Sequence, residues 1–296
     1  MLHYRAWPGM GETLDGLLAQ TRRPDEVVVV DHASGDGSVV HIRDAYPAIE
    51  LVELEENRGP TAGMNRLISE IMQRGVDAVF VFPHDIELAP DALEHLAIHL
   101  EDNPRLGAVG PLVGHQRDRE RVFCAGGHVD PRTWDFTFVD QPSRMGSWRG
   151  RPPHPVDFLE LGGILLRADA VRAAGGLPVR FYYMHDDLDY TLRIGSLGWG
   201  LECVPAARAW QDLGDPGRTD LIPPPPPYLQ VRNRLGLIAN NAPRRILARE
   251  ILRVLSWLVR DAVRPRGGSR SDLWPRFRGL ADFCLGRWGP PPPSAR

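Results

Sequence analysis

The chain has 296 residues, of which 43% are hydrophobic and 25% are charged. This composition is that of a globular protein and excludes a wholly disordered, collagen-like or disulfide-scaffold chain. All 35 basic residues are arginine, and they are unevenly placed. Residues 244–296 hold 12 Arg against 4 acidic residues, a net charge of +8, whereas residues 1–243 hold 23 Arg against 34 acidic residues, a net charge of −11. Any proposed function must therefore explain an acidic body with a basic tail.

Cysteine usage and hydropathy narrow the class of protein further. Cys124, Cys203 and Cys284 lie far apart without CxxC spacing, which argues against a disulfide framework or a structural zinc site. No apolar run reaches the roughly 18–20 residues that a membrane span needs. The first residues lack the charged and then apolar pattern of a signal peptide. We therefore expect a cytoplasmic protein.

Helix and strand signals alternate along the first hundred or so residues. In chain order we predict a helix over Leu14–Ala19, a strand over Glu26–Val30, a helix near Val39–Tyr46, a strand over Ile49–Leu54, a helix over Thr61–Arg74, a strand over Ala78–Phe82 and a helix over Ala92–Glu101. Strands separated by helices indicate βαβ units, and hence an α/β fold with a mostly parallel, Rossmann-like sheet flanked by helices. Ligands bind such sheets at the carboxyl ends of the strands.

The remaining segments are less regular. Met1–Tyr4 is too short for a convincing central strand, so we expect either an open sheet edge or a natural start upstream. Residues 111–155, rich in Gly, Pro, Arg and Trp, predict a long irregular excursion of the kind that shapes an acceptor pocket. We then predict a strand over Phe158–Arg167, helices over Asp169–Ala174 and Asp187–Leu197, a stiff five-proline spacer at Pro223–Pro227, helices over Tyr228–Asn240 and Arg244–Val263, and a disordered end over Gly289–Arg296.

Polar side chains follow two of the predicted strands, where a ligand would bind. Asp31 comes directly after a buried strand, and a carboxylate there can accept hydrogen bonds from a nucleobase or a ribose hydroxyl. Ser34 and Asp36 in the same loop are also good helix caps, and capping is the commoner role of such residues. The small residues of Asn57–Asn65 would let a backbone approach a ligand, and the helix start there favours phosphate, although such a turn is more often structural.

Two further clusters carry carboxylates. Asp85 ends a predicted strand, where a carboxylate suits a divalent cation that keeps coordination sites for phosphate oxygens; the alternative is an ordinary loop acid. Asp186, Asp187 and Asp189 lie within four residues, and crowding of this kind raises a carboxylate pKa toward the working range of a general base. The i, i+4 pair of Asp189 and Arg193 indicates a helix start, so capping and salt bridging remain an alternative for part of this cluster.

Together these clusters resemble one family in order and spacing. The segments VVVVDHASGDGS, ENRGPTAGMNR, FVFPHDIEL, LGGILLRADAVRAAGGL and FYYMHDDLDYTLRIGSLGWG resemble those of family 2 glycosyltransferases with the GT-A fold. The resemblance runs from about Leu14 to Asn233 and is nearest to bacterial rhamnosyl- and galactofuranosyl-type enzymes that build cell-surface polysaccharides. Tyr228, followed by Arg232 and Asn233, is similar to their Tyr…Arg-Asn signature.

The resemblance implies a domain organisation and a reaction. Residues 1–222 would form a GT-A-like catalytic domain, with a donor half over about 1–110 and an acceptor half over about 111–222. Residues 223–288 would form a helical, basic C-terminal extension and residues 289–296 a disordered tail. The implied reaction is an inverting transfer from a nucleotide-diphosphate sugar to a hydroxyl of a glycan or polyprenyl-linked acceptor, with Asp187 as the general base and Asp186 beside it.

The resemblance also implies site residues and a cofactor. The residues implied to contact the nucleotide-sugar donor are Tyr4, Asp31, Ser34, Asp36, Asn57, Gly59, Gly63 and Asn65. Asp85 occupies the last aspartate of the family's metal motif, which implies a divalent cation, Mg²⁺ or Mn²⁺. Pro83 stands at the first aspartate of that motif and Gln211 at a late metal-binding histidine, so His84 and Asp212 are the candidate replacement ligands. The residues implied to support the site are Asp189, Arg193, Arg232 and Asn233.

Two alternatives remain at this point. Because two metal ligands are replaced, the chain could instead be a nucleotide-sugar-binding module or scaffold with impaired catalysis. The predicted helix within Arg244–Arg264 has an apolar stripe, Trp257 and a basic face, which suits an anionic membrane surface; packing on its own catalytic domain is an equal alternative. We predict peripheral association with the inner face of the cell membrane, and no nucleic-acid partner because no such motif is present.

Overall fold

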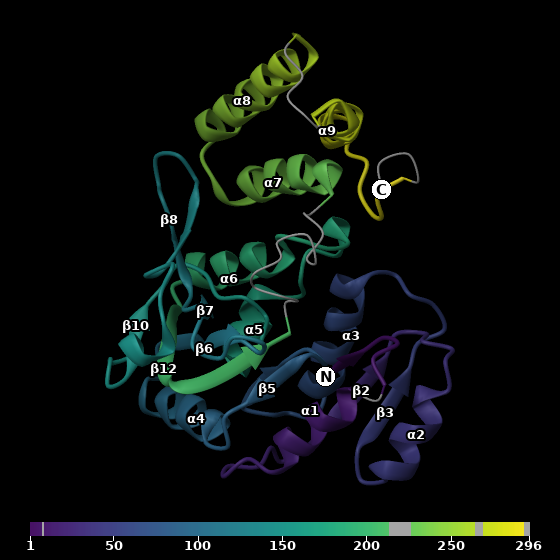
Figure 1. The fold of residues 1–296 in the computed structure, drawn as a ribbon, viewed down its shortest axis with the longest axis vertical. Helices are drawn as coiled ribbons and strands as arrows, with labels where there is room; N and C mark the ends of the chain where they lie inside the picture. Colours follow the sequence, from purple (N-terminus) through teal and green to yellow (C-terminus); the bar gives the residue numbers. More distant parts are fainter. Residues whose placement is uncertain (8, 213–225, 264–268, 293–296) are drawn as a thin grey trace.

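The computed structural model describes residues 1–7, 9–212, 226–263 and 269–292, which form an α/β part and a helical C-terminal part (Figure 1). The strands are β1 (Leu2–His3), β2 (Val28–Asp31), β3 (Glu50–Glu53), β4 (Ala78–Val81), β5 (Ile86–Leu88), β6 (Leu106–His115), β7 (Val122–Cys124), β8 (Gly127–Val129), β9 (Phe136–Phe138), β10 (His154–Pro155), β11 (Ile164–Arg167) and β12 (Gly200–Gln211). The helices are α1 (Gly9–Leu18), α2 (Ser38–Ala45), α3 (Pro60–Met72), α4 (Ala92–Asp102), α5 (Ala168–Ala174), α6 (Asp186–Ser196), α7 (Pro227–Asn241), α8 (Arg244–Val263) and α9 (Ser269–Cys284), with short 3₁₀ turns η1 (Met145–Trp148) and η2 (Val179–Phe181).

The sheet is mostly parallel, as the alternating pattern predicts. Strands β1, β2 and β3 pair in parallel in the order β1-β2-β3, and Leu2 forms a parallel bridge to Pro83 just beyond β4. Strand β11 runs antiparallel to both β4 and β6, and β12 runs parallel to β6. The two residues of β1 are therefore enough to fill the place between β2 and β4. Tyr4, Asp31 and Asp85 therefore lie at or just beyond the carboxyl ends of neighbouring strands, on the same side of the sheet.

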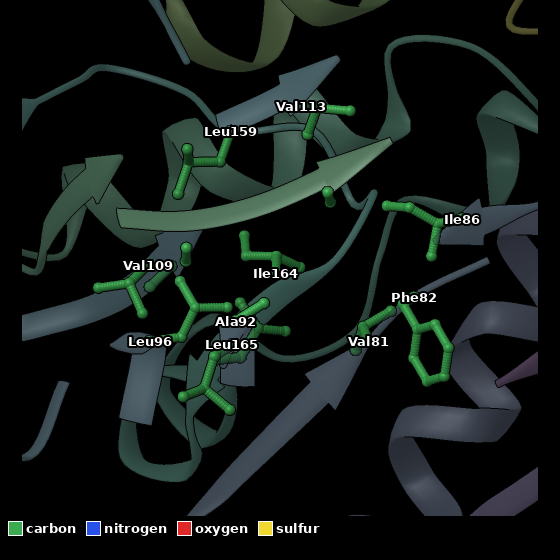
Figure 2. Packing of buried hydrophobic residues seen from close by; sticks show 14 of the residues in the cluster. Val81, Phe82, Ile86, Ala92, Leu96, Val109, Val113, Leu159, Ile164 and Leu165 are labelled. Carbon is green, nitrogen blue, oxygen red and sulfur yellow. The ribbon is translucent and has the colours of Figure 1, made fainter. Parts of the chain in front are cut away.

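The main core lies between the sheet and its helices. Val81 of β4, Val109 of β6 and Ile164 of β11 belong to the same buried cluster as Leu96 and Ala92 of α4, and Figure 2 shows part of this cluster. All of these side chains are buried. Each large apolar side chain that is removed from water stabilises the fold by about 1.5–3 kcal/mol. This layer holds the strands, and therefore the loops at their carboxyl ends, in fixed positions.

Two predicted segments need correction, and two elements were not predicted. The excursion predicted over 111–155 overlaps β6, a ten-residue buried strand. Its glycines are required by close packing, because a Cβ at Gly107 would lie 2.7 Å from Trp199 and one at Gly114 would lie 2.6 Å from Met145. The predicted strand over Phe158–Arg167 is regular only in β11. The sequence patterns also missed β12 and α9 altogether.

Helices α7, α8 and α9 form the C-terminal part of the described chain and pack around a small apolar cluster of their own (Figure 1). The predicted bounds of α7 and α8 are confirmed to within a residue or so.

In the predicted spacer, Pro223–Pro225 lie outside the described residues, and Pro227 already belongs to α7. Residues 293–296 of the predicted tail also lie outside. Gly289, the first residue of that tail, donates a backbone hydrogen bond to the Arg180 carbonyl and accepts one from the Arg232 side chain. None of the helices in the described ranges is both long and apolar enough to cross a bilayer.

Candidate active site

Helix α6 begins at Asp186, directly after a strained loop. Tyr182, Met184 and His185 all have left-handed backbone conformations, with φ of 69°, 74° and 65°. Such a conformation costs a residue with a side chain on the order of 1–3 kcal/mol, and it persists only where the surroundings hold it in place. The loop that presents Asp186 and Asp187 is therefore fixed by contacts from elsewhere in the chain.

Helix α7 supplies these contacts. The Asn233 Nδ2 group donates hydrogen bonds to the carbonyl oxygens of Phe181 at 3.1 Å, Tyr183 at 2.7 Å and Met184 at 3.0 Å. Arg232 Nη2 donates a further hydrogen bond to the Phe181 carbonyl at 3.1 Å. Both α7 side chains are fully buried. The two residues expected to support the site therefore lie against the backbone of the strained loop.

The buried guanidinium of Arg232 makes three further hydrogen bonds besides the one to Phe181. It donates to Tyr228 Oη at 3.1 Å, to the Gly289 carbonyl at 2.7 Å and to Asn233 Oδ1 at 3.0 Å. Tyr228 in turn donates to Asp282 of α9 at 3.0 Å. Burial lowers the pKa of Arg232, and the nearby Tyr228 and Asp282 oppose this effect. Hydrogen bonds between α7 and α9 thus fix the position of Arg232, which in turn binds the Phe181 carbonyl at the start of the strained loop.

Asp186 is tied to the loop that begins α3. Thr61 Oγ1 lies 2.9 Å from Asp186 Oδ2 and 2.9 Å from the Tyr182 carbonyl oxygen. Burial raises the pKa of Asp186, while the hydrogen bond from Thr61 acts in the opposite direction. Gly59 permits this approach, because a Cβ there would lie 2.4 Å from the Tyr182 ring. Sequence reasoning missed Thr61, although it lies within the Gly-rich segment that was singled out.

Asp187 is the more strongly perturbed carboxylate. Its Oδ1 accepts a hydrogen bond from the Leu188 backbone at 2.8 Å. Burial raises the pKa of Asp187 well above its usual range, and the charges of Asp186 and Glu160 raise it further. Burial also raises the pKa of Glu160, to about 7. Glu160 was not predicted, although its place as a single acid in the apolar stretch Phe158–Ile164 was a usable signal.

Asp189 belongs to the support of α6 rather than to the carboxylate pair. It is buried and accepts hydrogen bonds from Asn240 at 2.6 Å and Asn241 at 2.9 Å, both on α7. Arg193 lies 3.5 Å from its carboxylate, as the i, i+4 spacing predicts. Neutralised in this way, Asp189 does not add to the crowding of Asp186 and Asp187.

The loop after β2 is held by its own side chains. Asp31 accepts hydrogen bonds from Ser34 Oγ at 2.5 Å and from the Ser34 backbone at 3.1 Å. Asp36 accepts hydrogen bonds from the Ser38 backbone at 3.1 Å and from its hydroxyl at 2.6 Å, and these bonds lower the pKa of Asp36. These bonds stabilise the turn that leads into α2, whose N-cap position is Gly37 and carries no side-chain cap, so the capping role expected of Ser34 and Asp36 is not observed. Tyr4 follows β1 at the same edge of the sheet and is exposed.

The remaining donor-side residues contact other parts of the chain. Asn57 Oδ1 accepts a hydrogen bond from Gly59 at 2.9 Å. Asn65 makes two hydrogen bonds to the backbone of Leu177, at 2.7 and 3.0 Å. A Cβ at Gly63 would lie 2.6 Å from Leu2, so this glycine lets α3 approach β1. These contacts shape the donor-side wall, and direct contact with a donor stays a prediction.

The residues predicted as metal ligands do not form a cluster. Asp85 follows β4, and its two carboxylate oxygens lie 3.3 and 3.4 Å from Gln211 Nε2 at the end of β12. Asp212 is bound by Arg117, with contacts of 3.1 and 3.2 Å. Within the described ranges no group of three or more His, Cys, Asp or Glu side chains could hold a metal ion. That Asp85 binds a cation, with His84 or Asp212 as a further ligand, therefore stays a prediction, and all three residues line one cavity.

Asp85 alone still fits a cation that is shared with a substrate. It lines a cavity of about 570 Å³ together with His84, Asp212 and residues of α1. Mg²⁺ is usually bound by one or two carboxylates and otherwise by water and substrate phosphate oxygens. A single carboxylate that faces a cavity is enough for that arrangement, so the residues present fit a cation bound together with a diphosphate.

The chain also matches a known protein family and two characterised relatives in sequence. The model of the family described as Glycosyl transferase family 2 matches residues 1–149. An N-acetylglucosaminyl-diphospho-decaprenol L-rhamnosyltransferase of Mycobacterium tuberculosis is 27% identical over 225 residues, 69% of this chain and 72% of that relative. Galactofuranosyltransferase GlfT1 of the same organism is 24% identical over 257 residues, 82% of either chain.

The fold is also found among solved structures. The mannosyltransferase PcManGT from Pyrobaculum calidifontis, in complex with GDP-Man and Mn²⁺, superposes with a TM-score of 0.56 at 17% identity. The match covers 97% of this chain and 86% of that protein. This likeness shows a common fold.

Proposed function

The chain belongs to glycosyl transferase family 2, and from this premise we propose that it is an inverting glycosyltransferase with a polyprenyl-linked glycan acceptor. Its donor would be a nucleotide-diphosphate sugar, and its pathway the synthesis of a cell-surface polysaccharide. Two observations support this choice of acceptor and pathway. The rhamnosyltransferase relative is named for an acceptor with a diphospho-decaprenol group, and the second relative is a galactofuranosyltransferase.

The observation that carries the proposal is the setting of Asp187. This carboxylate is half-buried in the first turn of α6, its pKa is raised, and the loop before it is anchored by Asn233. Thr61 ties the neighbouring Asp186 to the donor-side loop. A general base is most effective when its pKa lies near the operating pH, and burial moves Asp187 in that direction. We therefore assign Asp187 as the base, with Asp186 as its neighbour.

The proposed step is a single displacement. The carboxylate of Asp187 takes the proton of the acceptor hydroxyl while the hydroxyl oxygen forms a bond to C1 of the donor sugar. The bond from C1 to the diphosphate oxygen breaks, and its electron pair leaves with the nucleoside diphosphate. Because the oxygen attacks from the face opposite the diphosphate, the configuration at C1 inverts. The charge that develops at C1 resembles an oxocarbenium ion, as in glycoside hydrolysis.

The donor would lie along the edge where β1, β2 and β4 end. In the proposal Asp31 contacts the base or ribose, and the walls come from Tyr4, Ser34, Asp36, Asn57, Gly59, Gly63 and Asn65. Asp85 would hold a divalent cation, Mg²⁺ or Mn²⁺, together with phosphate oxygens. When bound, such a cation supplies positive charge next to the leaving diphosphate.

Location and domain organisation belong to the same proposal. We assign residues 1–222 to the catalytic domain and residues 223–288 to an extension. Helix α7 of this extension supports the loop of residues 182–185 before Asp186, which is called the base loop below. On α8, Leu252, Leu255, Val259 and Val263 are exposed among arginines. A helix with exposed apolar and basic side chains binds an anionic lipid surface, which supports peripheral attachment to the inner face of the cell membrane.

The proposal is tested by assaying the full chain against UDP-, dTDP- and GDP-sugars, with and without Mn²⁺. Transfer or slow donor hydrolysis is expected with one donor class. Asp187→Asn should lower turnover by about 10²–10⁴-fold while donor affinity, measured by calorimetry, stays within about twofold. Asp169→Asn, which changes an exposed aspartate on α5, is the matched control. Full turnover in Asp187→Asn would remove the assigned base, and donor binding without turnover across the panel would favour the binding-module alternative.

A further inference from the structure

A second cavity, of about 640 Å³, lies beside the loop that precedes α6. Its wall includes Met184 and His185, the two residues that precede α6. The rest of the wall comes from α7, α8, one residue of α9 and the start of β9. The cavity therefore joins the C-terminal helices to the loop that presents Asp187.

The charges in this wall do not cancel. Four arginines and three carboxylates line the cavity, and each carboxylate is already paired. Glu250 accepts hydrogen bonds from Arg234 and Arg253, both at 2.7 Å. The other two carboxylates pair in the same way, Asp135 with Arg234 at 2.9 Å and Asp261 with Arg276 at 2.7 Å.

One arginine is left over. Arg260 is exposed and forms no ion pair with any residue that the structure describes. In addition, the Nε of Arg253 is buried and has no hydrogen-bond partner among those residues. The wall thus has surplus positive charge and unused donors. Guanidinium groups with free N–H donors bind phosphate oxygens well, because their planar fork can donate two hydrogen bonds at once.

An apolar groove of about 580 Å³ adjoins this cavity on α8. It is lined by Leu255, Ser256, Val259, Arg260 and Val263, so Arg260 belongs to both hollows. Val259 and Val263 are 64% and 71% exposed. The surface therefore changes, along one path, from an apolar groove to a cationic cavity and then to the base loop.

We propose that this path binds the polyprenyl diphosphate part of the acceptor. The isoprenoid chain lies in the α8 groove, the diphosphate binds the exposed guanidinium of Arg260, and the attached sugar extends past His185 toward Asp187. The inference rests on the proposed function and specifies its acceptor site. A phospholipid head group would satisfy Arg260 but would leave the cavity between Arg260 and His185 unused, so the observations favour the acceptor lipid.

The test measures binding of farnesyl diphosphate, a short polyprenyl diphosphate, to the full chain by calorimetry. A saturating nucleoside diphosphate is present throughout, so that the donor side cannot account for the signal. Farnesyl diphosphate should bind at least about tenfold more tightly than farnesol or inorganic diphosphate, since each of these lacks one half of the recognised group. Arg260→Glu should weaken binding by about tenfold or more. The matched control is Arg245→Glu, the same charge change at an exposed position of α8 outside both hollows.

A second variant tests the groove separately. Val259→Ser should reduce the advantage of farnesyl diphosphate over inorganic diphosphate and leave binding of inorganic diphosphate unchanged. Equal binding of farnesyl diphosphate by Arg260→Glu and Arg245→Glu would overturn the inference. So would a loss in Arg260→Glu that is confined to phosphatidylglycerol vesicles, since this would identify a head-group site.

The two proposals fail in different ways. If farnesyl diphosphate does not bind but the chain transfers sugar to a soluble glycoside, the inference falls and the proposed function stands. If farnesyl diphosphate binds as expected but no donor is turned over with any acceptor, the proposed function falls and the lipid site stands.

Discussion

Thr61 Oγ1 lies 2.9 Å from Asp186 Oδ2, and this contact joins the first turn of α3 to the first turn of α6. The same oxygen lies 2.9 Å from the Tyr182 carbonyl. The loop that begins α3 and the loop before α6 are therefore linked by one side chain. In the proposed function this contact connects the donor side to Asp186, the neighbour of the assigned base.

Removing the Thr61 hydroxyl tests this coupling. Thr61→Ala should lower kcat by about tenfold, because a hydrogen bond to a charged group is worth about 1.5–3 kcal/mol and its loss frees the carboxylate pair to move. The KM for the donor should change much less. Thr61→Ser keeps the hydroxyl and should restore most of the rate in steady-state assays. If Ala and Ser variants are equally slow, the methyl group of Thr61 matters and the hydrogen bond does not.

Asn233 should matter for both stability and turnover. Its side chain makes three hydrogen bonds to loop carbonyls, so Asn233→Ala should lower the free energy of unfolding by about 2–4 kcal/mol in a urea titration. Turnover should fall as well, because the left-handed residues before α6 lose their anchor. Asn240→Ala is a control on the same helix, since Asn240 also loses side-chain hydrogen bonds, with Asp189 and Arg180, but does not bind these carbonyls. Equal losses of turnover in the two variants would contradict the anchoring role.

The sequence pattern predicted the first half of the fold well because its signals are local. The β-branched run that ends at Asp31 and the helical spacing of α8 each lie within one segment. Strands β6 and β12 were missed because Gly and Pro interrupt their apolar patterns. In β6 the glycines are needed by neighbours such as Leu159, which a Cβ at Gly110 would approach to 2.9 Å. Such a requirement is set by tertiary packing and leaves no periodic signal.

The candidate site, too, could be predicted only where its residues are neighbours in the sequence. Asp186 and Asp187 could be found because they are adjacent and lie at a helix start. Thr61 could not be paired with them, since 125 residues separate it from Asp186. The ion pair of Asp212 with Arg117 could not be foreseen either, since 95 residues separate the two in the chain. Partners of charged groups are decided by long-range contacts, and these are what a single sequence hides.

The pH dependence of stability should reveal Glu160. Its pKa is raised from 4.5 to about 7 in the folded chain, so between these values the folded state keeps a proton that the unfolded state has lost. The contribution of Glu160 is therefore fully favourable below pH 4.5 and is lost as the pH rises through 7, a change of about 3 kcal/mol. Glu160→Gln should gain stability relative to the parent chain at pH 8 but not at pH 4. A pH-independent difference in urea titrations would contradict this assignment.

The pH dependence of turnover should respond to the same residue. The charge of Glu160 raises the pKa of Asp187, so removing that charge lowers it. Because the base must be ionised, the acid limb of kcat/KM in Glu160→Gln should shift to lower pH. The rate at high pH should be little changed, since Asp187 is ionised there in both proteins. A limb that stays in place would indicate that Asp187 does not set it.

The cation dependence should follow Asp85 and not Asp212. Asp85 is the carboxylate that faces the donor-side cavity beside Gln211, whereas Asp212 is bound by Arg117. In calorimetric titrations, Mn²⁺ should tighten binding of a nucleoside diphosphate to the parent chain, and Asp85→Asn should abolish most of this gain. Asp212→Asn should keep the gain to within about twofold, because the side chain that it changes serves an ion pair. If Asp212→Asn loses the Mn²⁺ effect and Asp85→Asn keeps it, the assignment of the cation-binding carboxylate is reversed. Equal Mn²⁺ effects in both variants and the parent would mean that the chain binds the diphosphate through other groups, with Asp85 held only by Gln211.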